Sequence, residues 1–268
     1  MKTPYKSVLT IAGSDSGGCA GIQADIKSIS ACGGYAASVI TATTAQNTQG
    51  VTDIHAIPID HIEKQLDAVF SDIHFDAVKI GMLHSCEVIK TISSKLKEYK
   101  APNIVIDPVM VATSGDNLIT DNAINCLKHI LPQASLVTPN SKEAEILIGH
   151  SVDNNNAEST AKEIGTAFKT SVLLKGGHLD ESTEQMFDVL FEYKSDRTYL
   201  FQNPRIDTKN THGTGCSLSS SIATFLSQGD SLENAVRKGC QYINQAINDG
   251  KDKILGKGNG PINHFGLE

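Results

Sequence analysis

Short apolar runs alternate with stretches of helical periodicity along almost the whole chain, and this alternation limits the folds that it can adopt. Strands are predicted at residues 7–12, 36–44, 50–57, 77–80, 104–106, 136–138 and 172–174. Helices are predicted between them, at residues 20–32, 59–70, 88–99, 121–130, 141–147 and 158–168. Such repetition is typical of parallel sheets covered by helices on both faces. The expected fold class is therefore α/β, with a mostly parallel central sheet.

The alternation changes near the carboxyl end. Residues 186–203 contain two strand-like runs around a turn at 194–196, which predicts an antiparallel hairpin at the sheet edge. Two helices follow, at residues 216–227 and 231–249. We expect one domain, residues 1–268, because the alternation of strands and helices resumes after the polar break at residues 153–156.

Composition excludes several function classes. A formal charge of −7, from 30 acidic and 23 basic residues, leaves no basic surface for a nucleic acid. No apolar run approaches the roughly 18 residues that a membrane span needs, and the N-terminal apolar stretch is too short for a signal peptide. The six cysteines have no Cys-x-x-Cys spacing, so we expect most of them to be reduced thiols of a cytoplasmic protein. An anionic substrate would need a local positive site.

Two glycine-rich segments suggest where such a site lies. The segment GSDSGGCAG, residues 13–21, joins the first strand to the first helix, but it matches neither a dinucleotide fingerprint nor a P-loop. It is either a ligand loop or a tight turn. The segment NTHGTGC, residues 210–216, precedes a helix of small residues, where backbone N–H groups and the helix dipole would hold a phosphoryl oxygen. Cys216 would gain thiolate character there, or be a buried cysteine behind a glycine-rich cap.

Other polar residues follow predicted strands, where parallel sheets place their ligands. Asp107 suits Mg²⁺ or a plain turn, and Lys175 suits a phosphate or a solvated loop. Asn140 and Glu143 are three residues apart, as water-mediated metal ligands or as a capping box. Asp25 faces the cleft or complements the helix dipole at the surface. Together these residues supply what phosphoryl transfer requires.

The order and spacing of these motifs resemble the hydroxymethylpyrimidine/phosphomethylpyrimidine kinases of thiamine biosynthesis, in the ribokinase-like superfamily. The resemblance covers nearly the whole chain, through TIAGSD (10–15), GIQAD (21–25), AQNT (45–48), KIGM (79–82), DPVM (107–110), VTPN (137–140) with Glu143, LKGGH (174–178) and THGTGC (211–216). It implies a ribokinase-like three-layer sandwich, a homodimer, and ATP and Mg²⁺ as cofactors. The implied reaction phosphorylates 4-amino-5-hydroxymethyl-2-methylpyrimidine to its monophosphate and then to its diphosphate.

The resemblance also implies a role for each candidate residue. Asp25 would hold the substrate hydroxymethyl group, and Gln46 would pair with the aminopyrimidine edge. The same pocket would be lined by Gly13, Ala20, Met82 and Val109. Cys19 departs from the pattern, because the family usually has a further glycine there; its side chain would narrow the loop or point away.

The remaining roles concern the phosphates. Asn140 and Glu143, with Asp107 nearby, would organise Mg²⁺ around ATP, and Lys175 would bind an ATP phosphate. An anion hole would be formed by Gly213, Thr214 and Gly215. Where the wider superfamily has an aspartate as base, this chain has Cys216, which would take the proton of the acceptor hydroxyl.

Three other functions remain as alternatives. A pyridoxal kinase of the same subfamily would act on a similar hydroxymethyl group, but related pyridoxal kinases carry an apolar residue where this chain has Gln46. A non-catalytic pyrimidine sensor would not need the complete set of transfer residues. An oxidoreductase is disfavoured by the absent dinucleotide fingerprint. The chain also lacks room for a fused thiamine-phosphate synthase, so we expect any such coupling to involve another protein.

Overall fold

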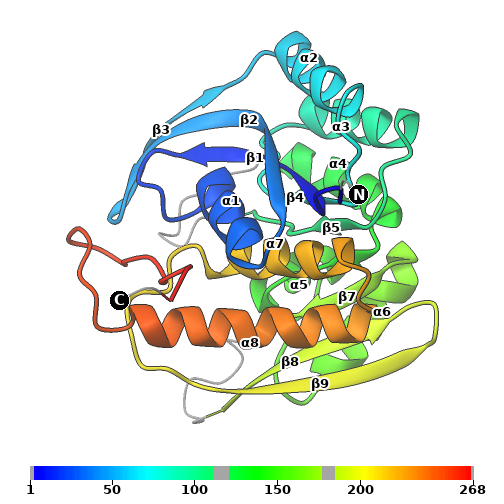
Figure 1. The fold of residues 1–268 in the computed structure, drawn as a ribbon. Coiled ribbons are helices and arrows are strands. Elements are labelled where there is room, and N and C mark those ends of the chain that lie inside the picture. Colours follow the sequence, from blue (N-terminus) through cyan, green and yellow to red (C-terminus); the bar gives the residue numbers. More distant parts are fainter. Residues whose placement is uncertain (1–2, 111–120, 177–184, 267–268) are drawn as a thin grey trace.

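The computed structural model describes residues 3–110, 121–176 and 185–266. Nine strands form one sheet in the order β3-β2-β1-β4-β5-β6-β7-β8-β9 (Figure 1). The strands are β1 (Ser7–Asp15), β2 (Tyr35–Asn47), β3 (Gly50–Ala56), β4 (Ala77–Ile80), β5 (Ile104–Ile106), β6 (Leu136–Val137), β7 (Ser171–Leu174), β8 (Gln185–Glu192) and β9 (Arg197–Pro204). The helices are α1 (Gly21–Ala31), α2 (Ile59–Phe70), α3 (Cys86–Glu98), α4 (Asp121–Ile130), α5 (Ser141–Ile148), α6 (Ala157–Phe168), α7 (Thr214–Ser227) and α8 (Leu232–Gly250), with a short 3-10 turn at Leu131–Gln133.

The centre of the sheet is parallel, as predicted. Strands β2, β1, β4, β5, β6 and β7 run in one direction, and β8 and β9 form the expected antiparallel hairpin at one edge. At the other edge β3 pairs antiparallel with β2, and residues 48–49 connect them. The apolar pattern predicted β3 as a strand but did not give its direction.

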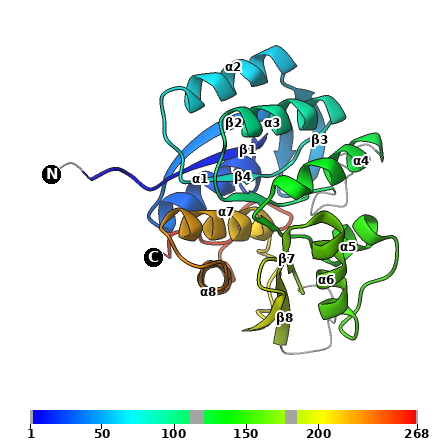
Figure 2. The ribbon, with the colours of Figure 1, turned by 90° about the vertical axis from the view of Figure 1, so that its right-hand side faces the viewer.

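Successive residues of the central strands point into two separate cores. In β4, Val78 and Ile80 pack against α2 and α3, whereas Ala77 packs beneath α7 and α8. The same alternation holds in β5, where Ile104 and Ile106 face one core and Val105 faces the other. Helices α2–α6 therefore cover one face of the sheet and α1, α7 and α8 the other (Figure 2). This arrangement is the predicted three-layer sandwich. None of the described helices is long and apolar enough to cross a membrane.

The cysteines differ in part from the prediction. Cys86 at the start of α3 and Cys126 in α4 form a disulfide, so two of the six thiols are not free. Because the two residues are 40 positions apart in sequence, their spacing gave no sign of the pairing. The other four cysteines are free: Cys19, Cys32, Cys216 and Cys240.

Candidate active site

A cleft of about 620 Å³ opens at the carboxyl ends of the parallel strands. Every site residue predicted from the sequence lines this cleft except Asp25. Two of them lie at irregularities of long strands: the β1–β2 register shifts around Gly13, and the β2–β3 register shifts next to Gln46. Bulges of this kind redirect side chains beside functional sites. The apolar pattern predicts strands that end at residues 12 and 44, so Gly13 and Gln46 lie beyond the predicted strands but within the observed ones.

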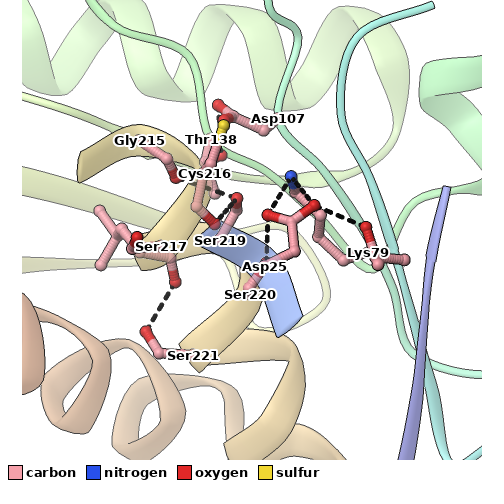
Figure 3. Close-up of polar contacts among 12 residues, drawn as sticks. Asp25, Lys79, Asp107, Thr138, Gly215, Cys216, Ser217, Ser219, Ser220 and Ser221 are labelled. Carbon is pink, nitrogen blue, oxygen red and sulfur yellow. Dashed lines mark hydrogen bonds and ion pairs between the residues drawn. The ribbon is translucent and has the colours of Figure 1, made fainter. Parts of the chain in front are cut away.

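Asp25 lies beneath the cleft rather than in its wall. Its carboxylate is fully buried and accepts hydrogen bonds from the Thr10 hydroxyl (2.6 Å), the Lys79 ammonium group (2.7 and 2.9 Å) and the Ser220 hydroxyl (2.8 Å). Figure 3 shows Asp25 held between Lys79 and Ser220. The expectation that Asp25 faces the cleft or the surface is wrong for this structure, because both carboxylate oxygens are already engaged inside the protein. A contact between Asp25 and the substrate hydroxymethyl group stays a prediction.

Lys79 is the functional candidate that sequence analysis missed. It is fully buried in β4, lines the cleft and pairs with Asp25. Burial opposes its charge, but the carboxylate of Asp25 outweighs that cost and raises its pKa. A lysine inside an otherwise apolar four-residue strand is unusual, and that signal was available in the sequence.

Cys216 lies in the first turn of α7 and faces the cleft. Removal of its side chain from bulk water raises the thiol pKa to about 11; the charges of Asp25 and Asp107 add to this, and that of Lys79 opposes it. The predicted thiolate character is therefore wrong for this structure, because burial outweighs the field of the helix start. The thiol is protonated at neutral pH.

The loop before α7 packs directly on the loop before α1. Gly213 has a φ of +87°, and a β-carbon there would overlap the carbonyl oxygen of Cys19. The amide of Cys19 donates to Oδ2 of Asp15 at 2.9 Å, and its buried side chain does not line the cleft. The extra side chain in the glycine-rich loop thus points away from the site. Burial raises the pKa of its thiol.

Charged residues gather at the ends of β5, β6 and β7. The ammonium group of Lys175 lies 2.8 Å from Oδ1 of Asp107 and 3.9 Å from Oε2 of Glu143. Burial opposes the charge on Lys175, but these two carboxylates outweigh it and raise the lysine pKa. Thr138 donates its hydroxyl to the same Asp107 oxygen at 3.2 Å. Two carboxyl groups thus share one ammonium group, so ionisation of both leaves a net negative charge. Two further residues of the resembling segment, Gly177 and His178, lie outside the described residues.

Asn140 and Glu143 form a capping box, which is one of the two arrangements that their spacing predicts. Oδ1 of Asn140 accepts the Glu143 amide at 2.9 Å, and Oε2 of Glu143 accepts the Asn140 amide at 2.8 Å. Burial raises the pKa of Glu143 to about 7, and the charge of Asp107 adds to this, whereas Lys175 opposes it. A divalent cation would compensate the negative charge of Glu143 and Asp107. Carboxylate and amide oxygens are ligands that Mg²⁺ accepts. The capping box is therefore compatible with Mg²⁺ binding by the same two residues.

Gln46 presents its side-chain amide at the opposite end of the cleft. One end of the amide lies beside the Thr44 hydroxyl and the other beside Nε2 of His212. Near it, Asp15, Cys19 and His212 form a group that could ligate a metal. The Asp15 carboxylate, however, already accepts three backbone N–H groups, from Gly17, Cys19 and Ala20. These three hydrogen bonds hold the segment in a tight turn, which explains why Asp15 and Cys19 lie close together.

A second set of cleft residues had no signal in the sequence. It comes from α5, β8, α8 and the segment after β9, and includes Ile146, Met186, Ile243 and Ile247. Isolated apolar residues on separate elements meet only in the folded chain. Nearby Asp188 is half-buried, and its Oδ1 accepts the backbone amide of Gly176 at 2.8 Å, which fixes the backbone after Lys175. The cleft thus continues past Lys175 into an apolar slot.

Comparison with known proteins identifies what this chain resembles. The family model of phosphomethylpyrimidine kinase matches residues 15–263. The hydroxymethylpyrimidine/phosphomethylpyrimidine kinase of Rhizobium meliloti is 45% identical, with 96% of each chain covered. That of Escherichia coli is 41% identical, with 97% of each chain covered. The thiamine biosynthesis bifunctional protein ThiED of Geobacter sulfurreducens is 49% identical over 98% of this chain.

The chain spans only 34% to 53% of the length of the bifunctional and multifunctional relatives, from Geobacter, two Corynebacterium species and Arabidopsis thaliana. Among solved structures, an ADP complex of Bacillus subtilis pyridoxal kinase aligns with a TM-score of 0.89 at 30% identity, covering 97% of this chain and 98% of that one. Phosphomethylpyrimidine kinase from Clostridium difficile aligns with a TM-score of 0.79 at 41% identity, covering 90% and 99%. These similarities confirm the expected ribokinase-like fold.

Proposed function

Since the chain belongs to the phosphomethylpyrimidine kinase family, we propose that it transfers the γ-phosphoryl group of ATP to the hydroxymethyl group of 4-amino-5-hydroxymethyl-2-methylpyrimidine. In a second reaction it phosphorylates the resulting monophosphate to the diphosphate. The observation that carries the proposal is the arrangement of the cleft. An amide that can pair with a pyrimidine lies at one end, the lysine and carboxylates lie at the other, and the loop before α7 lies between them.

The pyrimidine would occupy the end of the cleft formed by β1 and β2. The amide of Gln46 offers a donor and an acceptor side by side, which complements a ring nitrogen and its neighbouring amino group. Apolar contacts would come from Ala20, Met82 and Val109. Gly13 makes room for this wall, because a β-carbon there would meet Cε of Met82 at 2.7 Å. A buried amide rejects analogues that cannot satisfy it.

The nucleotide would occupy the other end, with its base against the apolar slot beyond Lys175. Lys175 would bind a phosphate, and Asp107, Asn140 and Glu143 would hold Mg²⁺. When bound, Mg²⁺ supplies positive charge that neutralises the phosphate oxygens. The excess of carboxylate charge around Lys175 supports this assignment.

In the transfer step, the hydroxymethyl oxygen forms a bond to the γ-phosphorus as the bond to the ADP oxygen breaks. Backbone N–H groups of Gly213, Thr214 and Gly215 would stabilise the charge on the transferred group. Cys216 would accept the hydroxyl proton, and it must lose its own proton first. The positive charge of Lys79 favours the thiolate. Lys175 favours it as well, because the attraction by which Cys216 raises the pKa of Lys175 acts in both directions.

Pyridoxal kinase activity is the second candidate. The Staphylococcus aureus pyridoxal kinase, solved with AMP-PCP and pyridoxal, aligns with a TM-score of 0.88 at 28% identity, covering 98% of this chain and 95% of that one. Backbone similarity therefore does not separate the two activities. The side chain at Gln46 does, because pyridoxal has no amino group beside a ring nitrogen for the amide to pair with.

The test is ATP-dependent release of ADP with hydroxymethylpyrimidine, its monophosphate and pyridoxal as separate acceptors, each with and without Mg²⁺. We expect turnover with both pyrimidines, little with pyridoxal and none without Mg²⁺. A preference for pyridoxal would overturn the substrate assignment. Binding of the pyrimidine without ADP release would revive the sensor hypothesis.

The proposal includes a homodimer and a cytoplasmic location, as the resemblance implies. Strand β3 supports the first of these, because it leaves an exposed sheet edge that includes Ile54. Sedimentation equilibrium across a range of protein concentrations would show whether two chains associate. Cell fractionation would test the location.

A further inference from the structure

The amide of Gln46 is surrounded by polar groups whose hydrogen bonds do not all fit together. Its Nε2 lies 3.1 Å from Nε2 of His212, and its Oε1 lies 3.0 Å from Oγ1 of Thr44. The same Thr44 hydroxyl lies 3.0 Å from the carbonyl oxygen of Ser14. His212 and Thr44 are both buried, with 7% and 8% of their surfaces exposed. Nδ1 of His212 has no hydrogen-bond partner among the residues that the structure describes.

In this orientation of the amide, two requirements conflict. Nε2 of His212 must be an acceptor, so the imidazole proton sits on Nδ1, where it is buried and unpaired. Thr44 has one hydroxyl proton, and both Ser14 and Gln46 present an oxygen to it. Only one of these two acceptors can receive the proton of Thr44.

A half-turn of the amide resolves the conflict at Thr44 and moves the imidazole proton to the ring nitrogen that has a partner. Nδ1 of His212 then remains an acceptor with no partner among the described residues. Oxygen and nitrogen of an amide are nearly equal in size, so the side chain fits the same space either way. Oε1 then accepts from Nε2–H of His212, and Nε2 of Gln46 donates to the Thr44 oxygen. The Thr44 proton remains available for Ser14. Oδ2 of Asp15, 3.8 Å from Nε2 of His212, also favours a proton on that nitrogen.

We propose that His212 is a positioning residue, whose Nε2–H donates to Oε1 of Gln46 and thereby fixes which end of the amide faces the loop before α7. Burial lowers the pKa of His212, with Asp15 opposing, so the neutral ring with its proton on Nε2 is the relevant form. The role in recognition rests on the function proposed above. The hydrogen-bond assignment itself does not.

The orientation decides where the reacting group of the substrate points. In the pyrimidine, the amino group stands between the ring nitrogen and the hydroxymethyl carbon. With Oε1 on the His212 side, the amino group lies on that side and the hydroxymethyl group lies beyond it, toward the segment that continues from His212 to Cys216. The opposite orientation would direct the hydroxymethyl group toward Thr44 and β2, away from that segment.

The first experiment determines the tautomer of His212 in the purified protein without substrate. Nitrogen-15 NMR distinguishes the two neutral forms, and the spectrum of His212→Gln identifies the His212 signals among the nine histidines. We expect the proton on Nε2. A proton on Nδ1 would overturn the proposal, whatever the protein phosphorylates.

The second experiment compares His212→Leu, which has no donor, with His212→Gln, which retains one. We expect KM for hydroxymethylpyrimidine to rise about tenfold or more in His212→Leu, while His212→Gln stays closer to the original protein. KM for pyridoxal should change little, because pyridoxal has no amino group beside a ring nitrogen to pair with the side-chain amide of Gln46. Thr44→Val and Thr44→Ser form a second matched pair with the same expectation. Equal losses for both acceptors would indicate a merely structural role and contradict the proposal.

Discussion

At the scale of single residues, the proposed role of Cys216 as the base requires its thiol to lose a proton before it accepts one from a hydroxyl. Since its pKa is raised to about 11 by burial, only a small fraction is thiolate at neutral pH. We expect kcat/KM to increase with pH above neutrality, by up to about tenfold per pH unit. Rates measured from pH 6 to 10 would show this limb. Cys216→Ser should lose the limb together with most of the activity; an unchanged profile would exclude the thiol as the base.

Glu143 offers a prediction about stability. Its pKa rises from 4.5 to about 7 because of burial, so the folded protein holds this proton more tightly than the unfolded chain does. The stabilising contribution is present in full below the unfolded pKa and is lost as pH rises from about 4.5 to 7. Glu143→Gln keeps an acceptor for the capping box but removes the charge. We expect the variant to unfold at a higher temperature than the original protein near pH 8, by roughly 2–4 °C.

The same substitution should weaken activation by Mg²⁺, because one carboxylate is lost. Thermal unfolding at several pH values, with a Mg²⁺ titration of the rate at each, separates the two effects. At about pH 4 the two proteins should unfold at nearly the same temperature, since Glu143 is then protonated. A variant that is as stable as the original protein at pH 4 but less stable near pH 8 would contradict the prediction, because the charge of Glu143 would then stabilise the fold.

Much of the site was predictable at the residue scale, and the exceptions have physical causes. Polar residues and glycines at strand ends identified the lining of the cleft, because parallel strands end at one edge of the sheet. Asp25 was misplaced because its partners Lys79 and Ser220 come from other elements. The thiol of Cys216 was misjudged because the spacing of residues shows a helix start but not the burial around it. Neither kind of information lies in a local pattern.

At the scale of elements, the Asp25–Lys79 pair joins α1 to β4, and Ser220 connects it to α7. Removing one partner leaves a buried charge alone, which typically costs about 3–5 kcal/mol. We expect Lys79→Met to lower the free energy of unfolding by that amount, measured by urea denaturation. The double variant Lys79→Met/Asp25→Asn should recover part of the loss, because no buried charge remains. If the double variant is as unstable as the sum of the single changes, the pair is not coupled in this way.

The contact between the two glycine-rich loops makes a second prediction at this scale. Gly213→Ala places a β-carbon against the carbonyl oxygen of Cys19 and forces alanine into a left-handed conformation. We expect kcat to fall at least about tenfold, since displaced N–H groups no longer meet the phosphoryl oxygens. Gly229→Ala is the control, because Gly229 also has a positive φ of +93° but has no atom within 4 Å of an added β-carbon. Equal kinetic effects of the two substitutions would argue against the loop contact.

The elements themselves were predicted closely, but their ends were not. The alternation of apolar runs predicted the order of strands and helices and the edge hairpin. The predicted strands end before the parts of β1 and β2 that carry Gly13 and Gln46, because a bulge interrupts the regular pattern of a strand. Two residues of the candidate active site lie at those irregular ends. A hydrophobic pattern predicts the ends of strands poorly where the chain departs from regular geometry.

For the whole molecule, the Cys86–Cys126 disulfide restrains a 40-residue separation in the unfolded chain. A closed loop of this size stabilises a protein by roughly 2–4 kcal/mol. We expect Cys86→Ala/Cys126→Ala to lower the unfolding temperature by several degrees, with activity retained. The original protein in dithiothreitol should behave in the same way. Equal stability of both proteins under oxidising conditions would mean that the bond does not form in solution.

The hydrogen bond between Ser220 and Asp25 spans 195 positions of the chain. A protein is made from its amino terminus, so Asp25 leaves the ribosome long before Ser220 exists. During most of its synthesis the chain therefore carries Gln46 on β2 without the loop before α7 that completes the cleft. On the proposed function, the nascent protein consumes no ATP until α7 has been made and packed onto α1, and catalytic competence arrives only as synthesis nears its end.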